Sequence, residues 1–264
     1  MMSWANYGWD EDPSNKGGGN VNQMPMTKVF RYWMTQKATR RLLFLDSPPC
    51  KLYEHNLYNL GQRENAICLR RNNIEESCPL CDCEVKGVNY AYEIGYFTVI
   101  EIGEVVDGAD GRIIKPVVSK KGKEYQFTRK MYGAKFGSQE NPGVMSILKR
   151  KAMKHGGSLE GTVWDVYRSG EKKSNVGDEF DFVEKVNLQD WSKYLIHAGC
   201  QEAEIDREQP DGRGFLEPVD YLNVLGPPDD VVAMYHGLVG NSKAGSSENT
   251  DWKGEGARTE GSGW

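Results

Sequence analysis

Three cysteines and one histidine stand at spacings typical of metal ligation. His55 is followed after twelve residues by Cys68, after nine more by Cys78, and after two more by Cys81. Thiolate sulfur and imidazole nitrogen are zinc ligands, and four protein ligands close a tetrahedral site and leave no position for a catalytic water. The spacing therefore predicts one structural Zn²⁺ per chain, whose binding energy would serve as folding energy.

Other uses of these cysteines stay open at this point. A lone C-x-x-C pair can also be a redox pair, although a thioredoxin-type pair should open a helix and no helix signal follows Cys81. Cys83 could replace Cys81, because a gap of four residues also falls within the range of zinc ligand spacings. Cys50 and Cys200 are expected to be ordinary buried thiols.

Composition limits the class of protein. The chain has 264 residues, 38% hydrophobic and 27% charged, which suits one large domain or two small ones. It contains no apolar run of about eighteen residues, so no transmembrane helix is expected. The N-terminus lacks the basic and apolar pattern of a secretory signal. Six cysteines gathered around a C-x-x-C pair favour a reducing compartment, and hence the cytosol.

Charge is distributed unevenly along the chain. The net charge is −5, yet residues 28–186 carry a net +5, whereas residues 187–264 carry −8 and residues 1–27 carry −2. Such a pattern fits a nucleic-acid site with acidic flanks, or merely an uneven surface charge.

The expected elements are mostly short strands. Alternating or β-branched segments bounded by turn residues predict strands at 41–45, 53–60, 66–70, 96–106, 112–119, 125–127, 158–168 and 179–186. Helical spacing is expected at 130–136, 144–155, 189–200 and 229–238. Many short strands with one inserted helix favour a mainly β fold with appended helices, built on a small closed barrel of the five-stranded OB type.

These elements divide the chain into four parts. Residues 1–27 are expected to form a flexible arm, and residues 28–186 an OB-fold core with an inserted zinc ribbon at about 50–90. Residues 187–240 should form a helical extension. The Gly- and Ser-rich residues 241–264 should be disordered, because they lack the apolar residues needed for a core.

No catalytic constellation emerges from the sequence. His155, His197 and His236 lie far apart, and the phosphate-binding pattern GxxxxGK[ST] is absent. An enzyme is therefore not expected.

Basic and aromatic residues instead interleave after the ligand cysteines. Phosphates attract Lys and Arg, and unpaired bases stack on aromatic rings, so this segment is a candidate single-strand site. The alternative is that its rings are core and its cations a solvated rim. The candidate residues are Lys120, Lys121, Tyr125, Phe127, Arg129, Lys130 and Tyr132.

The ligand spacing resembles that of the zinc-containing single-stranded DNA-binding (helix-destabilising) proteins of T4-like and related bacteriophages. Phe44-Leu45-Asp46-Ser47 is similar to a strand end ahead of that family's zinc site. Tyr90, Tyr96-Phe97 and the Tyr125–Tyr132 segment are similar to aromatic and basic positions at its DNA cleft. The resemblance covers about residues 44–186. The acidic, Gly-rich N-terminus and the weakly acidic C-terminus depart from the family pattern.

The resemblance implies a non-enzymatic protein that coats single-stranded DNA during phage replication, recombination and repair in the cytoplasm of an infected host cell. Phage replication proteins would bind the C-terminal tail, for which Trp264 is the candidate anchor, since Trp is favoured at interface hot spots. The alternative function is a zinc-ribbon scaffold that contacts only proteins of a replication or transcription complex.

Overall fold

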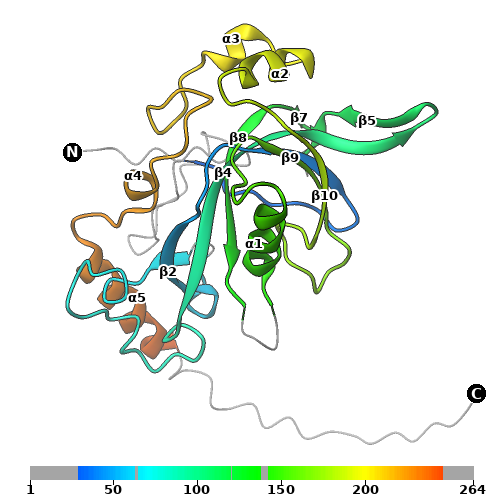
Figure 1. The fold of residues 1–264 in the computed structure, drawn as a ribbon. Coiled ribbons are helices and arrows are strands. Elements are labelled where there is room, and N and C mark those ends of the chain that lie inside the picture. Colours follow the sequence, from blue (N-terminus) through cyan, green and yellow to red (C-terminus); the bar gives the residue numbers. More distant parts are fainter. Residues whose placement is uncertain (1–28, 63–64, 120, 138–141, 246–264) are drawn as a thin grey trace, which may run out of the picture.

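The computed structural model describes residues 29–62, 65–119, 121–137 and 142–245, with side chains as far as residue 240. The described chain forms a mainly β structure of antiparallel strands, with helix α1 against the sheet and helices α2 to α5 following it (Figure 1). The expected flexible arm 1–27 lies outside the described residues, as do residues 246–264 of the expected disordered tail.

One long strand organises the sheet. Strand β4 (Ala91–Gly108) contains mostly apolar residues on both faces, and its middle from Ile94 to Gly103 is buried throughout. Along one edge it pairs first with β2 (Cys50–Asn56) and then with β1 (Thr39–Phe44). Along the other edge it pairs with β8 (Thr128–Lys135) and then β5 (Gly111–Lys115).

The remaining strands extend this arrangement. Strand β1 also pairs with β9 (Thr162–Tyr167), which pairs with β10 (Glu179–Lys185), while β3 (Asn65–Ile67) adds to β2. The short strands β6 (Val117–Val118) and β7 (Glu124–Tyr125) form a separate pair. Among the described residues no backbone pairing joins β8 to β10, so the expected closed barrel is not found.

Most expected strands and helices are present, at least in part. The strand expected at 53–60 ends at Asn56 and is followed by a 3-10 helix at Tyr58–Leu60. The helix expected at 130–136 is wrong, because residues 130–135 belong to strand β8. Pairing with β4 from Ile94 to Glu101 satisfies its backbone, and tertiary hydrogen bonding overrides a weak local preference. Residues 29–37 form no helix or strand, and Arg31 makes an isolated bridge to Met131.

Three apolar clusters form the core. One lies between the sheet and α1 (Val144–Lys154) and contains Trp164 and Tyr132. A second joins α2 (Trp191–His197) and α3 (Glu202–Ile205) to Leu43 of β1 and to Ile100 and Ile102 of β4. The third joins residues 50–90, here called the ligand region, to α4 (Tyr221–Leu225) and α5 (Val231–Gly245).

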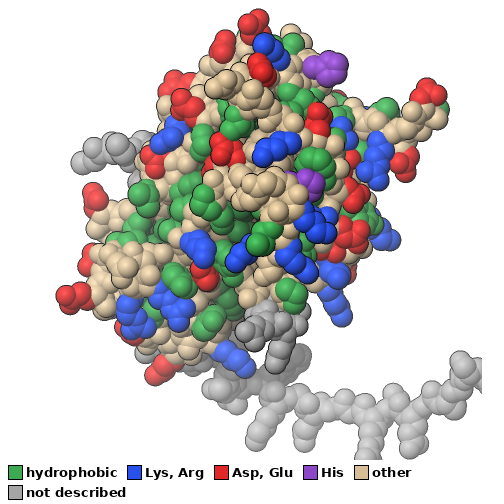
Figure 2. Space-filling model, viewed as in Figure 1, with side chains coloured by type: hydrophobic (Ala, Val, Ile, Leu, Met, Phe, Trp, Pro, Cys, Tyr) green, Lys and Arg blue, Asp and Glu red, His purple; other side chains and the backbone are tan. Residues whose placement is uncertain are grey.

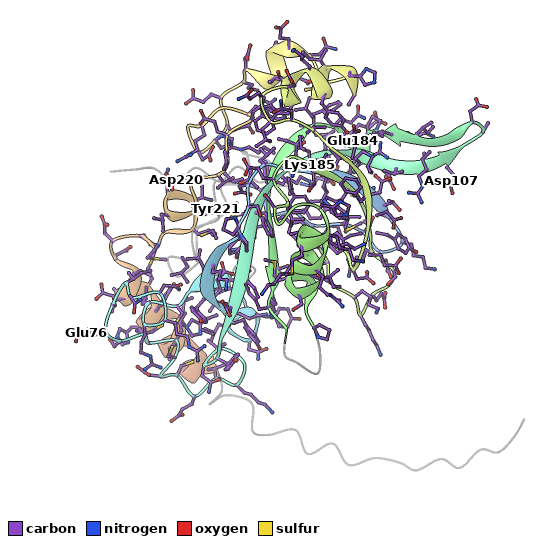
Figure 3. All side chains as sticks on the ribbon, in the orientation of Figure 1. Glu76, Asp107, Glu184, Lys185, Asp220 and Tyr221 are labelled. Atoms are coloured by element: carbon purple, nitrogen blue, oxygen red, sulfur yellow. The ribbon has the colours of Figure 1, made fainter. Side chains whose placement is uncertain are left out.

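Residues 187–240, here called the C-terminal strap, run from the α2–α3 end back to the ligand region (Figure 1). Polar contacts fasten the strap to the sheet. The Arg129 guanidinium of β8 pairs with Asp211, and both side chains are fully buried. Further along lies Tyr221 on α4, labelled in Figure 3. It donates a 2.6 Å hydrogen bond to Asp46 and lies 2.9 Å from the Thr98 hydroxyl. The strap thus contains α2 to α4 and the first part of α5, and buried polar contacts hold its middle part to the sheet.

Candidate functional site

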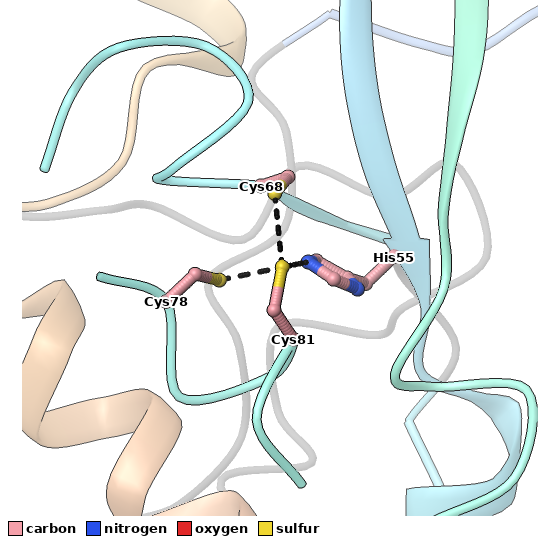
Figure 4. A group of neighbouring side chains, drawn as sticks. All are labelled: His55, Cys68, Cys78 and Cys81. Carbon is pink, nitrogen blue, oxygen red and sulfur yellow. Dashed lines mark hydrogen bonds between the residues drawn. The ribbon is translucent and has the colours of Figure 1, made fainter. Parts of the chain in front are cut away.

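The structure brings the four predicted metal ligands together. The ligand atoms of His55, Cys68, Cys78 and Cys81 all lie within 4.8 Å of one another (Figure 4). The His55 Nε2 atom is 3.5 Å from the Cys78 sulfur and 3.6 Å from the Cys81 sulfur, and the Cys68 and Cys81 sulfurs are 3.5 Å apart. Zn–S bonds of about 2.3 Å and a Zn–N bond of about 2.0 Å at tetrahedral angles would place such atoms roughly 3.6–3.8 Å apart. The cluster therefore has the dimensions of a site that could hold zinc.

The histidine is oriented for ligation through Nε2. Its Nδ1 atom lies 2.6 Å from the Val88 carbonyl oxygen, which can only accept, so Nδ1 carries the proton. The Nε2 lone pair is then left for a metal, an arrangement common among ligating histidines. His55 is fully buried at the end of β2, which fixes the ring.

Local structure supplies the three thiols. Cys68 directly follows strand β3, and its sulfur accepts a hydrogen bond from the Arg71 backbone N–H. The Cys78–Cys81 turn is closed by a backbone hydrogen bond from Cys81 N–H to Cys78 C=O. Cys83 is not part of the cluster, because its thiol donates to the Leu80 carbonyl. Geometry thus selects Cys81 over Cys83, while Cys200 is buried and Cys50 is half-buried.

The three thiols differ in pKa. Hydrogen bonding to Cys78 and then burial raise the pKa of Cys68, and burial raises the pKa of Cys81. Hydrogen bonding from the Cys68 thiol, followed in importance by that from His55 and from backbone N–H groups, lowers the pKa of Cys78 well below its usual range. A thiolate is the form that binds metal. All six cysteines of the chain lack disulfide partners in the structure.

The ligand region is covered by helix α5. The apolar side chains Val231, Tyr235 and Leu238 are buried against it, in one cluster with Cys68 and Cys78. The Tyr235 hydroxyl donates a 2.8 Å hydrogen bond to the carbonyl of Ile67, just before the ligand Cys68. Helix α5 thus covers one side of the four ligand residues.

A second feature is a cleft of about 840 Å³ beside β4 and β8. Its walls come from separate parts of the chain. They are residues Arg31–Trp33, Asn56 of β2, Asn65 of β3, Ile94 and Tyr96 of β4, Gly133–Lys135 of β8, Pro142–Val144, Ile147 and the loop residues Lys172–Val176 with Asp178.

Cations dominate the cleft wall. Lys135, Lys172 and Lys173 are exposed, and of the lining residues only Asp178 is acidic. Arg31 also lines the cleft but is neutralised, because its guanidinium contacts both carboxylate oxygens of the buried Glu54. Trp33 adds an aromatic side chain that is 42% exposed. The cleft thus combines positive charge with an accessible ring.

Glycine shapes the floor of this cleft. A Cβ at Gly133 would lie 2.4 Å from the Tyr96 ring, so only glycine lets that ring cross β8. The Tyr96 hydroxyl is then anchored by Arg31, which donates to it at 2.9 Å, and by Glu54, to which it donates at 2.5 Å. Burial raises the pKa of Tyr96 well above its usual value, so its hydroxyl stays protonated.

The predicted DNA-binding aromatic residues on β4 and β8 are mostly interior. Tyr96, Phe97 and Tyr132 are buried, and Phe97 and Tyr132 pack against Phe44 in the core beside α1. Their rings offer no open face for a base in this conformation. A role in DNA binding stays a prediction for these residues, and the structure assigns them packing partners within the protein.

The predicted basic residues of β8 are also engaged internally. Arg129 pairs with Asp211, and Lys130 pairs with the buried Glu101 while its ammonium lies 4.5 Å from the centre of the Tyr125 ring. Phe127 is buried in the cluster beneath α2 and α3. The charges of Arg129 and Lys130 are therefore paired inside the protein. Contact of these residues with DNA stays a prediction.

The other predicted residues lie on the surface or outside the described chain. Tyr90 is 56% exposed and makes an edge contact with Tyr92. Lys121 is exposed. Lys120 and Trp264 lie outside the described residues.

Sequence reasoning did not identify the cleft. Its exposed members Trp33, Lys135, Lys172 and Lys173 come from separate segments, and no short motif joins them. The one usable signal was the polar loop with two adjacent lysines between two alternating strands, since binding residues concentrate on such loops.

No protein-family model, curated protein or solved structure matches this chain. Within the described residues no helix is both long and apolar enough to cross a membrane.

Proposed function

We propose that the chain is a sequence-tolerant, non-enzymatic single-stranded DNA-binding protein. The observation that carries the proposal is the cationic cleft, whose wall includes Trp33, Lys172 and Lys173. Single strands bind grooves that combine positive charge with rings on which bases stack.

The strand order supports a binding role at this place. The path β10-β9-β1-β4-β8, with α1 between β8 and β9, is consistent with a partly open five-stranded OB barrel in which β1, β4, β8, β9 and β10 are strands one to five. Such barrels bind oligonucleotides on the face of strands two and three, between the loops that follow strands one and four.

The cleft corresponds to this position. Ile94 and Gly133 lie on the strands that correspond to two and three, Asn56 lies in the insertion after strand one, and Lys172 and Lys173 lie in the loop after strand four. All of these elements line one cleft. Such a cleft favours a linear polymer that lies across the sheet, rather than a small ligand in a closed pocket.

Zinc is the metal we propose for the ligand cluster, with one ion per chain in a structural role. Four protein ligands leave no open coordination position for a catalytic water. The ion would hold together a region that has few regular elements, namely β3 and the 3-10 helix at Tyr58–Leu60.

The phage replication setting rests on the family resemblance. It includes partner proteins bound through the C-terminal tail and a location in the cytoplasm of an infected host cell.

The test is titration of an oligo-dT strand at several salt concentrations. The Lys172→Ala/Lys173→Ala variant should bind more weakly, and the slope of log K against log salt should fall by about 1.4, because each phosphate contact contributes about 0.7 on single strands. Lys115→Ala/Lys193→Ala, which removes two exposed lysines outside the cleft, is the charge-matched control.

A second variant separates stacking from charge. Trp33→Ala should weaken binding by about 1–3 kcal/mol, the scale of one stacked base, with little change in the salt slope. Wild-type protein that binds no oligo-dT at low salt would refute the proposal and favour the protein-only scaffold. Equal losses in the cleft and control variants would move the site away from the cleft.

A further inference from the structure

Helix α1 extends the cleft toward a second exposed surface. The side chains of Val144 and Ile147, at its start, line the cleft, while Met145 and Leu148 are buried in the core. From Ile147 to its last residue Lys154, at 1.5 Å per residue, the helix continues for roughly 10 Å. Anything that fills the cleft therefore contacts the start of α1.

The outer side of α1 is strongly basic. Helix α1 contains four Lys or Arg residues and no acidic residue. Lys149, Arg150 and Lys154 are exposed, and no ion pair within the described residues engages them. Figure 2 shows Lys and Arg side chains gathered over and beside α1, whereas Asp and Glu are more frequent toward the α2–α3 end.

An exposed aromatic pair stands at the far end of the helix. The ring of His155, which follows α1, stacks on Phe182 of β10 with centroids 3.9 Å apart, and both rings contact Trp164 edge-on. Phe182 remains 39% exposed. Trp164 holds the pair from below, so the ring of Phe182 is a fixed platform at the surface.

Strand alternation keeps the acidic residues of β10 away from this platform. Phe180 and Phe182 share one face of the strand, and Lys151 of α1 donates to the Phe180 carbonyl at 2.6 Å. Asp181 points to the opposite face, where it faces Arg112. The surface over α1 and β10 thus presents cations and an aromatic ring.

We propose that the single strand continues from the cleft along α1 and that Phe182, backed by His155, stacks a base there. Lys149, Arg150 and Lys154 contact the phosphates of this second segment. The inference rests on the proposed function, and it identifies a long single strand as the substrate of that site. Continuity with the cleft and charge complementarity carry it.

The test compares two oligo-dT lengths, about 6 and about 16 nucleotides, which span the site sizes of single OB folds. The Lys149→Ala/Arg150→Ala/Lys154→Ala variant should keep wild-type affinity for the short strand. For the long strand its affinity should fall roughly 10–50-fold near 0.15 M salt, and its salt slope should fall by about 2, as expected for three lost phosphate contacts. Phe182→Ala should weaken only the long-strand complex.

The control is Lys86→Ala/Lys115→Ala/Lys193→Ala, which removes the same charge from exposed positions elsewhere. Unchanged long-strand affinity in the α1 variant would overturn the inference while leaving the cleft in place. Equal losses on both lengths, or in the control, would show a general charge effect and also overturn it. Failure of wild-type protein to bind either strand would instead refute the proposed function, and the inference with it.

Discussion

The ligand region and the sheet are held together by different means. Between Leu57 and Tyr90 the described residues form one 3-10 helix and the three-residue strand β3 as their only regular elements. The sheet contains an 18-residue strand paired on both edges and three apolar clusters around it. A region with little backbone pairing depends on its ligand cluster, whereas a continuous sheet depends on burial and on its internal charge pairs.

The largest effect should follow removal of a metal ligand. Cys78→Ala should abolish stoichiometric metal binding and unfold the ligand region, because binding energy on the order of 10 kcal/mol or more is folding energy in small zinc modules. The sheet should stay folded. Elemental analysis gives the metal content, and hydrogen exchange locates the unfolding.

Cys200→Ala is the matched control, since Cys200 is buried but lies outside the ligand cluster. Full metal content in the Cys78 variant would contradict the ligand assignment. Loss of protection throughout the sheet would contradict the contrast between the two regions.

The next effect concerns the buried charge pair between the sheet and the strap. Asp211→Ala should lower the free energy of unfolding by about 3–5 kcal/mol, because it leaves the Arg129 charge buried with only the carbonyl oxygens of Gly214 and Glu217. Urea denaturation measures it.

The double variant Arg129→Met/Asp211→Leu sharpens this prediction. Replacing both charges by apolar residues of similar size should restore much of the lost stability, because no unpaired charge remains. If Asp211→Ala alone is as stable as wild type, the Arg129–Asp211 pair does not hold the strap to the sheet.

A smaller, pH-dependent effect is expected at Asp46. Burial raises the pKa of Asp46 to about 6, and the nearby Glu160 adds to this, although hydrogen bonds from Tyr221 and Thr98 act in the opposite direction. A raised folded-state pKa means that the folded protein binds the proton more tightly than the unfolded chain. Protonation of Asp46 therefore stabilises the folded protein fully below about pH 4, and this contribution is lost as the pH rises through about 6.

Asp46→Asn removes this titration. The loss between pH 4 and 7 should be on the order of 1–3 kcal/mol in wild type, and the variant should show a correspondingly flatter curve in this window. Urea denaturation at several pH values measures both. Parallel curves would exclude Asp46 as the source.

The smallest effect is expected at the surface pair of α2. Lys193 contacts Asp190 at 3.0 Å, and both side chains are largely exposed. Lys193→Ala should change the free energy of unfolding by less than about 0.5 kcal/mol, because exposed pairs are screened by water and salt. A loss as large as that in the Asp211 variant would remove the distinction between buried and surface pairs.

Local sequence was sufficient for the ligand cluster and most strands. His55, Cys68, Cys78 and Cys81 converge because a short loop and a C-x-x-C turn restrict where their side chains can lie. The long run of β-branched and aromatic residues in β4 predicted a strand, since such side chains pack well on a pleated surface.

Only the tertiary structure determines which basic and aromatic side chains are buried and which are exposed. Composition left the Tyr125–Tyr132 segment open between a single-strand site and core. Burial of Tyr132 and pairing of Arg129 and Lys130 with carboxylates direct these side chains inward. The exposed cations come instead from loops distant in sequence, such as Lys172 and Lys173. Which side of a strand faces solvent depends on the elements that cover it, and short-range patterns do not contain that information.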